Sequence, residues 1–353
     1  MRALYLPSTY SSPRGYRISD LPKPKITTET PLLIQVYACS LNTGDTHIAK
    51  GDFRFMHSTP FPHIIGHEFA GIITERHPSY AGEFQIGDEV FGVIPVTMNR
   101  GAAAQFLVAS DHCMARKPAR LSFAEAAALG VAGVTAITAL DLGEELLGGL
   151  VGRTVFVSAT LGGVGSVAVQ LAKHAYGAAR VIGTVSTGKL GMVGEKLGDN
   201  TVDSVVDYVR EDVVDRVGRR KVDLFFDTQG TVGRNVGVVR KGGVVVSCSS
   251  LCSGTEMEKL MPAPLLVRVA LDIISWTAAK WYGLGGVTFK AVLAVENRSL
   301  LERLAKLASE GKVRGVVGTS IKMDEENLDA IQEACGIIVS GKGGVGRLVL
   351  EID

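Results

Sequence analysis

A short apolar strand that runs through a glycine-rich turn directly into a helix sets the fold of this chain. Residues 154–158 read Thr-Val-Phe-Val-Ser, residues 159–165 read Ala-Thr-Leu-Gly-Gly-Val-Gly, and apolar side chains then follow at helical spacing to residue 173. Such a turn directs backbone N–H groups and the positive end of a helix dipole at one spot, where a pyrophosphate can bind. A purely structural turn is the alternative. The pattern predicts a dinucleotide site formed by Ala159, Gly162, Gly163, Val164 and Gly165.

The rest of the chain fits two domains, since 353 residues exceed what one hydrophobic core usually accommodates. From residue 153 onward short apolar strands alternate with helices, which indicates an α/β fold with a parallel, doubly wound sheet. Strands are expected at 181–185, 222–227, 243–247, 287–295 and 347–352, and an amphipathic helix at 300–307. Residues 1–122 are β-rich instead, and Ser122 with Glu125 forms a capping box that starts a helix.

The end of the second strand indicates which dinucleotide binds. An NAD enzyme usually carries an acidic residue there, about 20 residues past the turn, to bind the ribose hydroxyls. Here residues 185–189 read Val-Ser-Thr-Gly-Lys, without an acid. Ser186 and Thr187 can donate hydrogen bonds to a 2′-phosphate, and Lys189 can neutralise it. The segment therefore predicts NADPH, the alternative being a solvated loop that happens to lack an acid.

Several further motifs stand in an order that resembles the quinone-reductase and enoyl-reductase branch of the medium-chain dehydrogenase/reductase superfamily. They extend over nearly the whole chain: Asn42-x-x-Asp45, residues 66–71 (Gly-His-Glu-Phe-Ala-Gly), 87–90 (Gly-Asp-Glu-Val), Thr135-Ala136 with Ala139-Leu140, the turn, 206–208 (Val-Asp-Tyr), Asp227-Thr228-x-Gly230 and 346–350.

This resemblance implies a GroES-like β-barrel over residues 1–122 and a Rossmann domain over 123–290. Residues 291–353 would complete the Rossmann sheet and return to the first domain. The resemblance also implies an active site in the cleft between the domains, with Asn42 and Thr135 near the nicotinamide and Tyr208 near the adenosine phosphate.

The triplet Gly66-His67-Glu68 supplies a zinc ligand in the alcohol dehydrogenases that this chain resembles. Those enzymes carry a cysteine where this chain has Asn42, Cys39 stands three residues too early, and their four closely spaced cysteines are missing. We therefore expect no zinc, and we expect His67 to be a hydrogen-bonded residue. The other nearby histidines, His47, His57 and His63, form no metal-binding pattern and are expected at the surface or lining a cleft.

Without zinc, hydride addition to an activated C=C bond or a quinone is the reaction that such a site supports best. The Asn42 amide and the Thr135 hydroxyl are the candidate donors to the developing oxyanion. The substrate is expected to be a small molecule, with a polyketide-like enone of secondary metabolism as one candidate. The alternative is an NADPH-binding protein without redox turnover, either a scaffold or a cavity that guides cyclisation.

Composition adds expectations about partners and compartment. The net charge of +1, with both signs scattered, argues against nucleic-acid binding. Five cysteines without CxxC spacing suit reduced thiols, which predicts a cytoplasmic protein. We expect no transmembrane segment, and we expect the protein to be a monomer or a homodimer. Residues 259–285, which contain Trp276 and Trp281, have three possible roles: they are buried, they form a dimer interface, or they touch a membrane. Burial or self-association is the interpretation that we favour.

Overall fold

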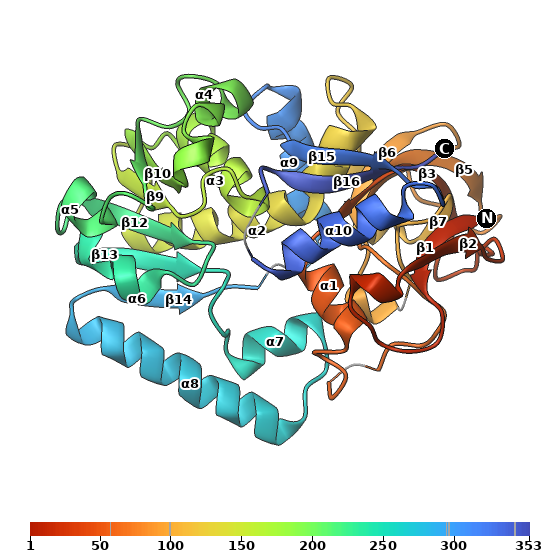
Figure 1. Cartoon of the computed structure of the whole chain (residues 1–353), viewed down its shortest axis with the longest axis horizontal. Helices are drawn as coiled ribbons and strands as arrows, with labels where there is room; N and C mark the ends of the chain where they lie inside the picture. The colour runs from red at the N-terminus through yellow and green to blue at the C-terminus, as the bar shows by residue number, and fades with distance from the viewer. Residues whose placement is uncertain (57, 99, 294, 296, 342–343) are drawn as a thin grey trace. The chain divides into compact units, whose positions relative to one another are not determined.

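The computed structural model describes residues 1–353 except 57, 99, 294, 296, 342 and 343 (Figure 1). The chain divides into two compact units, Met1–Val131 with Glu296–Asp353 (unit 1) and Ala132–Val295 (unit 2). The division falls inside helix α2 (Phe123–Leu147), which begins after the Ser122–Glu125 capping box: each residue's backbone N–H donates to the other's side chain. The sequence places the domain boundaries at residues 122 and 290, and these boundaries remain a prediction.

Unit 1 is built on a seven-stranded sheet in the order β15-β16-β3-β5-β6-β8, with β7 also paired to β3. Its strands are β3 (Leu32–Leu41), β5 (Glu68–Arg76), β6 (Glu89–Val93), β7 (Phe106–Ala109), β8 (Met114–Arg116), β15 (Val317–Lys322) and β16 (Arg347–Glu351). A smaller sheet joins β1 (Arg2–Leu6), β2 (Arg17–Asp20) and β4 (His63–Ile64). The helices are α1 (Thr43–Lys50), α9 (Arg298–Ser309) and α10 (Leu328–Val339).

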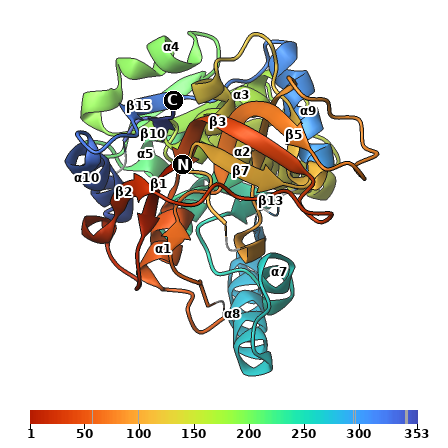
Figure 2. The ribbon, with the colours of Figure 1, turned by 90° about the vertical axis from the view of Figure 1, so that its right-hand side faces the viewer.

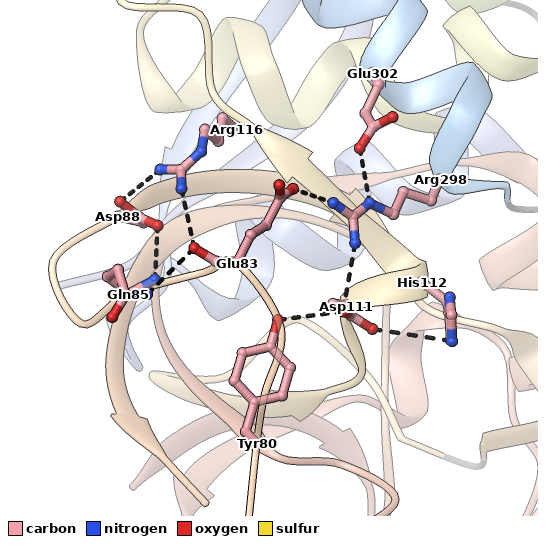
Figure 3. A network of polar contacts seen from close by, with 9 residues as sticks. All are labelled: Tyr80, Glu83, Gln85, Asp88, Asp111, His112, Arg116, Arg298 and Glu302. Carbon is pink, nitrogen blue, oxygen red and sulfur yellow. Dashed lines mark hydrogen bonds and ion pairs between the residues drawn. The ribbon is translucent and has the colours of Figure 1, made fainter.

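The returning C-terminal segment is bound to loops of the N-terminal part of unit 1 by the Arg298 side chain (Figure 3). Its guanidinium pairs with the carboxylates of Glu83, Asp111 and Glu302, and it lies over the ring of Phe84 at 5.2 Å from the ring centre. Because an arginine presents its donors in a fixed planar fork, one side chain at the start of α9 can hold partners from three segments. Residues far apart in sequence thus share one unit.

Unit 2 contains a six-stranded parallel sheet in the order β11-β10-β9-β12-β13-β14. The strands are β9 (Thr154–Val157), β10 (Arg180–Val185), β11 (Ser204–Asp207), β12 (Val222–Asp227), β13 (Val239–Ser247) and β14 (Thr288–Ala291). Numbered from β9, this order is 3-2-1-4-5-6, that of the doubly wound dinucleotide-binding fold, so the predicted fold class is confirmed. The sheet ends with β14, and the later strands β15 and β16 belong to unit 1 rather than to this sheet.

The helices of unit 2 besides α2 are α3 (Gly163–His174), α4 (Met192–Leu197), α5 (Val213–Val217), α6 (Val232–Asn235), α7 (Gly254–Leu260) and α8 (Leu265–Leu284). Core side chains such as Phe156 and Phe225, whose rings are 4.7 Å apart, fill one face of the sheet. Helix α8 contains no buried residue, so burial inside the chain is not the role of this segment. Among the described residues α2 alone has the length and apolarity of a membrane span, but 72% of its most apolar stretch is buried, as in a core helix.

Candidate active site

The glycine-rich turn lies at the carboxyl end of β9 and runs into the start of α3. Gly162 caps this helix, and its N–H donates to the Ala159 carbonyl at 2.7 Å. Ala159 itself has a φ of +49°, a left-handed conformation that costs energy in a residue with a side chain. The N–H groups of Gly163, Val164 and Gly165 stand in the first turn, where no acceptor is available within the helix. This arrangement offers several donors to an anion.

The two flanking glycines of this turn are required for different reasons. A Cβ on Gly165 would lie 2.1 Å from the Ala159 carbonyl oxygen, so only glycine lets α3 begin this close to the end of β9. A Cβ on Gly162 would lie 3.1 Å from the same oxygen, a tight contact that a shift of a few tenths of an ångström would relieve, and Gly162 has an ordinary extended backbone. Backbone conformation thus does not demand a glycine at 162. A side chain there would occupy space at the start of the helix, where a phosphate would bind.

The segment after β10 contains an interaction that the sequence analysis missed. Thr187 Oγ1 donates a 2.6 Å hydrogen bond to the carboxylate of Asp207, which ends the neighbouring strand β11. Although residues 185–189 contain no acid, a carboxylate does lie beside this segment, because parallel pairing of β10 and β11 sets Asp207 beside Val185. The Thr187 hydroxyl lowers the pKa of Asp207, which keeps this group a carboxylate. Tyr208, the next residue, is 49% exposed.

A second buried carboxylate ties three strand ends together near the turn. Asp227, at the end of β12, accepts hydrogen bonds from the hydroxyls of Ser158 after β9, Ser247 at the end of β13, and Thr231. The Thr228 hydroxyl donates to the Ser158 carbonyl at 2.8 Å. Ligands of open parallel sheets bind beyond the carboxyl ends of the strands. Asp227 thus fixes the edge where a dinucleotide would lie.

In unit 1, the candidate donor Asn42 is held on three sides. Its Oδ1 accepts from the N–H of Asp45 and its own N–H donates to the Asp45 carboxylate, a capping box at the start of α1. Its Nδ2 donates to Glu68 Oε1 at 3.1 Å. The second Nδ2 hydrogen has no acceptor in the described part of the chain. The amide is therefore oriented by the protein and keeps one donor for a ligand.

Glu68, which the sequence analysis treated only as part of a triplet, is the centre of this arrangement. It is fully buried, and besides Asn42 it accepts from the Val131 N–H at 2.7 Å and pairs with the Arg347 guanidinium. Burial lowers the pKa of Arg347 to about 10, which leaves it a cation at neutral pH. A buried ion pair requires such additional donors to offset the loss of hydration. Glu68 is a positioning residue for Asn42.

The zinc ligands of an alcohol dehydrogenase do not fit these residues. His67 Nδ1 lies 2.5 Å from the Asp45 carboxylate, both side chains being buried, and the Asn42 amide is bonded to Glu68. Across the described residues no group of three His, Cys, Asp or Glu side chains could hold a metal.

The remaining candidate residues are spread over the chain. Among the other histidines, His47 pairs with Asp52, His63 is buried in β4, and His57 lies outside the described residues. Thr135 is buried in the part of α2 that belongs to unit 2.

Comparison with known proteins shows the family. Residues 28–140 match the family model of the alcohol dehydrogenase GroES-like domain, and residues 163–283 match that of the zinc-binding dehydrogenases. A chloroplast envelope quinone oxidoreductase homolog of Arabidopsis thaliana is 36% identical over 94% of this chain and 92% of its own length. The chain belongs to the medium-chain dehydrogenase/reductase superfamily. The resemblance to its quinone- and enoyl-reductase branch is thereby confirmed.

Two further relatives bear on cofactor and fold. The NADPH-dependent alkenal/one oxidoreductase of Arabidopsis chloroplasts is 34% identical over 62% of this chain and 55% of its own length. The aligned part spans about half the length of this relative and of the 2-methylene-furan-3-one reductase of Solanum lycopersicum. The structure of the quinone oxidoreductase from Coxiella burnetii superposes with a TM-score of 0.78, at 25% identity, over 100% of this chain and 99% of that one.

Proposed function

We propose that this protein is an NADPH-dependent, zinc-independent reductase that transfers hydride to an activated C=C bond or a quinone. The observation that carries the proposal is the glycine-rich turn, whose Gly162 leaves space for a phosphate at the carboxyl edge of a 3-2-1-4-5-6 sheet. The alkenal/one and quinone oxidoreductases among the relatives support the substrate class. Zinc-independence rests on Asn42, whose neutral amide stands where the alcohol dehydrogenases carry a cysteine ligand and whose Nδ2 donates to Glu68.

Several groups of unit 2 are suited to hold the dinucleotide. NADPH, when bound, supplies the hydride. The first N–H groups of α3 would hold the pyrophosphate, with Ala159 shaping the turn because its own N–H donates to the Thr184 hydroxyl, and Tyr208 would lie beside the adenosine. Because the Thr187 hydroxyl is occupied by Asp207, the 2′-phosphate depends on Ser186 and Lys189. Arg210, whose Nε lies 4.0 Å from the Asp207 carboxylate, adds a second cation at this edge.

The catalytic contribution of unit 1 is a hydrogen-bond donor held in place before the substrate arrives. When hydride adds to the β-carbon of an enone, negative charge develops on the carbonyl oxygen, and a proton later completes the reduction at the α-carbon. We assign the second Nδ2 hydrogen of Asn42 to that oxygen, with Glu68 fixing the orientation of the amide. A donor fixed in advance needs no reorganisation as the charge forms.

The test is NADPH oxidation across a panel of quinones and α,β-unsaturated ketones, with variants of Asn42. Asn42→Ser keeps an N-cap oxygen for α1 but removes the amide donor, so kcat should fall by roughly tenfold to a thousandfold while NADPH affinity changes little. Asn42→Ala removes both the N-cap oxygen and the amide donor. Comparing the two variants therefore separates the effect of helix capping from the effect on catalysis. Tight NADPH binding without turnover on any substrate would instead identify a non-redox protein, and the proposal would fail.

A further inference from the structure

Helix α8 exposes large apolar side chains, whereas an ordinary surface helix exposes polar ones. It runs along the outside of unit 2 beside α7 and β14 (Figures 1 and 2). Its charged residues Arg268 and Asp272 are partly covered, whereas its large apolar side chains are exposed. A surface helix normally buries its apolar stripe and exposes its polar face. The reversal means that solvent is not the medium for which this outer face is suited.

The inward side of α8 is already satisfied by unit 2. The Arg268 guanidinium pairs with Glu258 of α7 at 2.6 Å, and the Asp272 carboxylate accepts from the Gly254 N–H at 2.9 Å. The Tyr282 ring packs on Phe289 of β14, with ring centres 5.0 Å apart. These contacts fix which side faces outward, so rotation of the helix cannot hide the apolar face.

The outward side of α8 is mainly apolar, with Thr277 and Lys280 as its exposed polar side chains. At about 100° per residue its exposed apolar positions cover an arc of about 180°. Both tryptophans of the chain lie here, Trp276 at 63% and Trp281 at 72% exposure. The only charge on this side is that of Lys280, whose ammonium lies over the Trp276 ring. The outer face consists of Leu265, Leu266, Val269, Ile273, Ile274, Trp276, Lys280, Trp281 and Leu284.

We propose that this outer face of α8 docks on the surface of a lipid bilayer that contains anionic lipids. The helix is 20 residues long, and half its surface amounts to roughly 450 Å² on a cylinder about 30 Å by 10 Å. A stable protein interface buries about 800 Å² on each partner. One helix of a second copy would cover only a narrow seam of the arc, whereas a fluid interface contacts its whole width.

The charge and the aromatic residues favour the same occupant. A second copy would oppose Lys280 with the same surface, which carries no carboxylate of α8, since Asp272 is turned inward. A bilayer with anionic headgroups receives a lysine at its surface and accommodates tryptophans at the headgroup level. A helix with Trp and Leu on the bound face lies in the plane of the membrane and does not cross it.

The experiment uses the two tryptophans as reporters, because both lie on the proposed contact face. Purified full-length protein is mixed with vesicles of phosphatidylcholine and phosphatidylserine, and Trp emission and co-sedimentation are measured. Emission should move to shorter wavelength and the protein should sediment with the vesicles. Ile273→Asp should lower the partition coefficient at least about tenfold, or 1.4 kcal/mol. Lys280→Ala should lower it about fivefold, the equivalent of ~1 kcal/mol per lysine.

Controls separate lipid docking from self-association and from misfolding of a variant. Val151→Asp changes an apolar residue that is 80% exposed and does not belong to α8, so it should bind vesicles like the wild type; thermal unfolding of each variant verifies its fold. Unchanged emission and no sedimentation with vesicles would overturn the proposal. So would a blue shift that follows protein concentration without lipid and accompanies a dimer in analytical ultracentrifugation, since a second copy would then be the occupant. Equal loss of binding in Val151→Asp would also refute it.

Discussion

Replacing Gly165 by alanine tests the geometry of the turn. The added Cβ would stand 2.1 Å from the Ala159 carbonyl oxygen and 3.1 Å from that of Ser158, whereas ordinary contact begins at 3.4 Å. Since the first obstacle is backbone, the turn itself must move by about 1 Å, at an overpacking cost of about 1–3 kcal/mol. The higher helix propensity of alanine offsets about 1 kcal/mol of this loss in the free energy of unfolding. The net loss of unfolding free energy should be at most about 2 kcal/mol.

The effect on the cofactor should be larger than the effect on stability. A displacement of about 1 Å takes donors out of the 2.7–3.2 Å range in which N–H groups bond to phosphate oxygens. Losing one hydrogen bond to a charged group costs about 1.5–3 kcal/mol, so NADPH affinity should fall at least tenfold. Isothermal titration with NADPH and denaturant unfolding measure the two quantities on the same preparation.

Two other glycines serve as controls for Gly165→Ala. Gly336 lies in the interior of α10 with nothing within 4 Å of an added Cβ, so Gly336→Ala should stabilise the protein by about 0.5–1 kcal/mol and leave NADPH affinity unchanged. Gly162→Val adds bulk in the space assigned to the phosphate and should abolish binding at little cost in stability. A folded Gly165→Ala variant with wild-type NADPH affinity would refute the placement of the pyrophosphate.

Substitutions at three further positions test the polar contacts. Glu68→Gln leaves the Arg347 cation buried without its partner, so the free energy of unfolding should fall by about 3–5 kcal/mol and kcat should fall with it; an unchanged chemical denaturation midpoint would contradict the buried pair. Thr187→Val should raise the pKa of Asp207, measured by carboxylate NMR. Because Thr187 lowers the pKa of Asp207 in the native state, its stabilising effect is present above about pH 4 and is lost as the pH falls through that native pKa. The melting temperatures of the wild type and of Thr187→Val should therefore converge in acid. Arg298→Ala should lower the free energy of unfolding by about 1–3 kcal/mol, and Arg298→Lys should restore only part, since lysine lacks the planar fork; full rescue by lysine would refute the role of that fork.

Local pattern was enough to predict those parts of the fold that depend on neighbours in sequence. The strand Val222–Asp227 has the predicted bounds, and the Ser122–Glu125 capping box begins α2 as expected. These features arise from alternation and from side chains three residues apart, which a single sequence displays.

Contacts between distant segments escaped prediction for a physical reason. Asp207 reaches Thr187 only because β10 and β11 pair in a particular register, and Glu68 meets Arg347 across strands separated by most of the chain. Helical periodicity in α8 shows that two faces exist, but only the contacts of Arg268 and Asp272 with α7 decide which one turns outward. Two of the three charged residues of α8, Arg268 and Asp272, lie on the inward side, which reverses the usual inference.

The proposed reaction is tested most directly by following the hydride. NADPH labelled with deuterium at the transferring position of the nicotinamide is incubated with the protein and an enone, and the product is analysed by mass spectrometry and NMR. The metal content of the same sample is measured by elemental analysis. We predict deuterium on the β-carbon of a saturated ketone, far less than one zinc per chain, and turnover that survives a chelator. Deuterium on the carbonyl carbon, with stoichiometric zinc and activity lost on chelation, would contradict the account and identify a zinc-dependent carbonyl reductase.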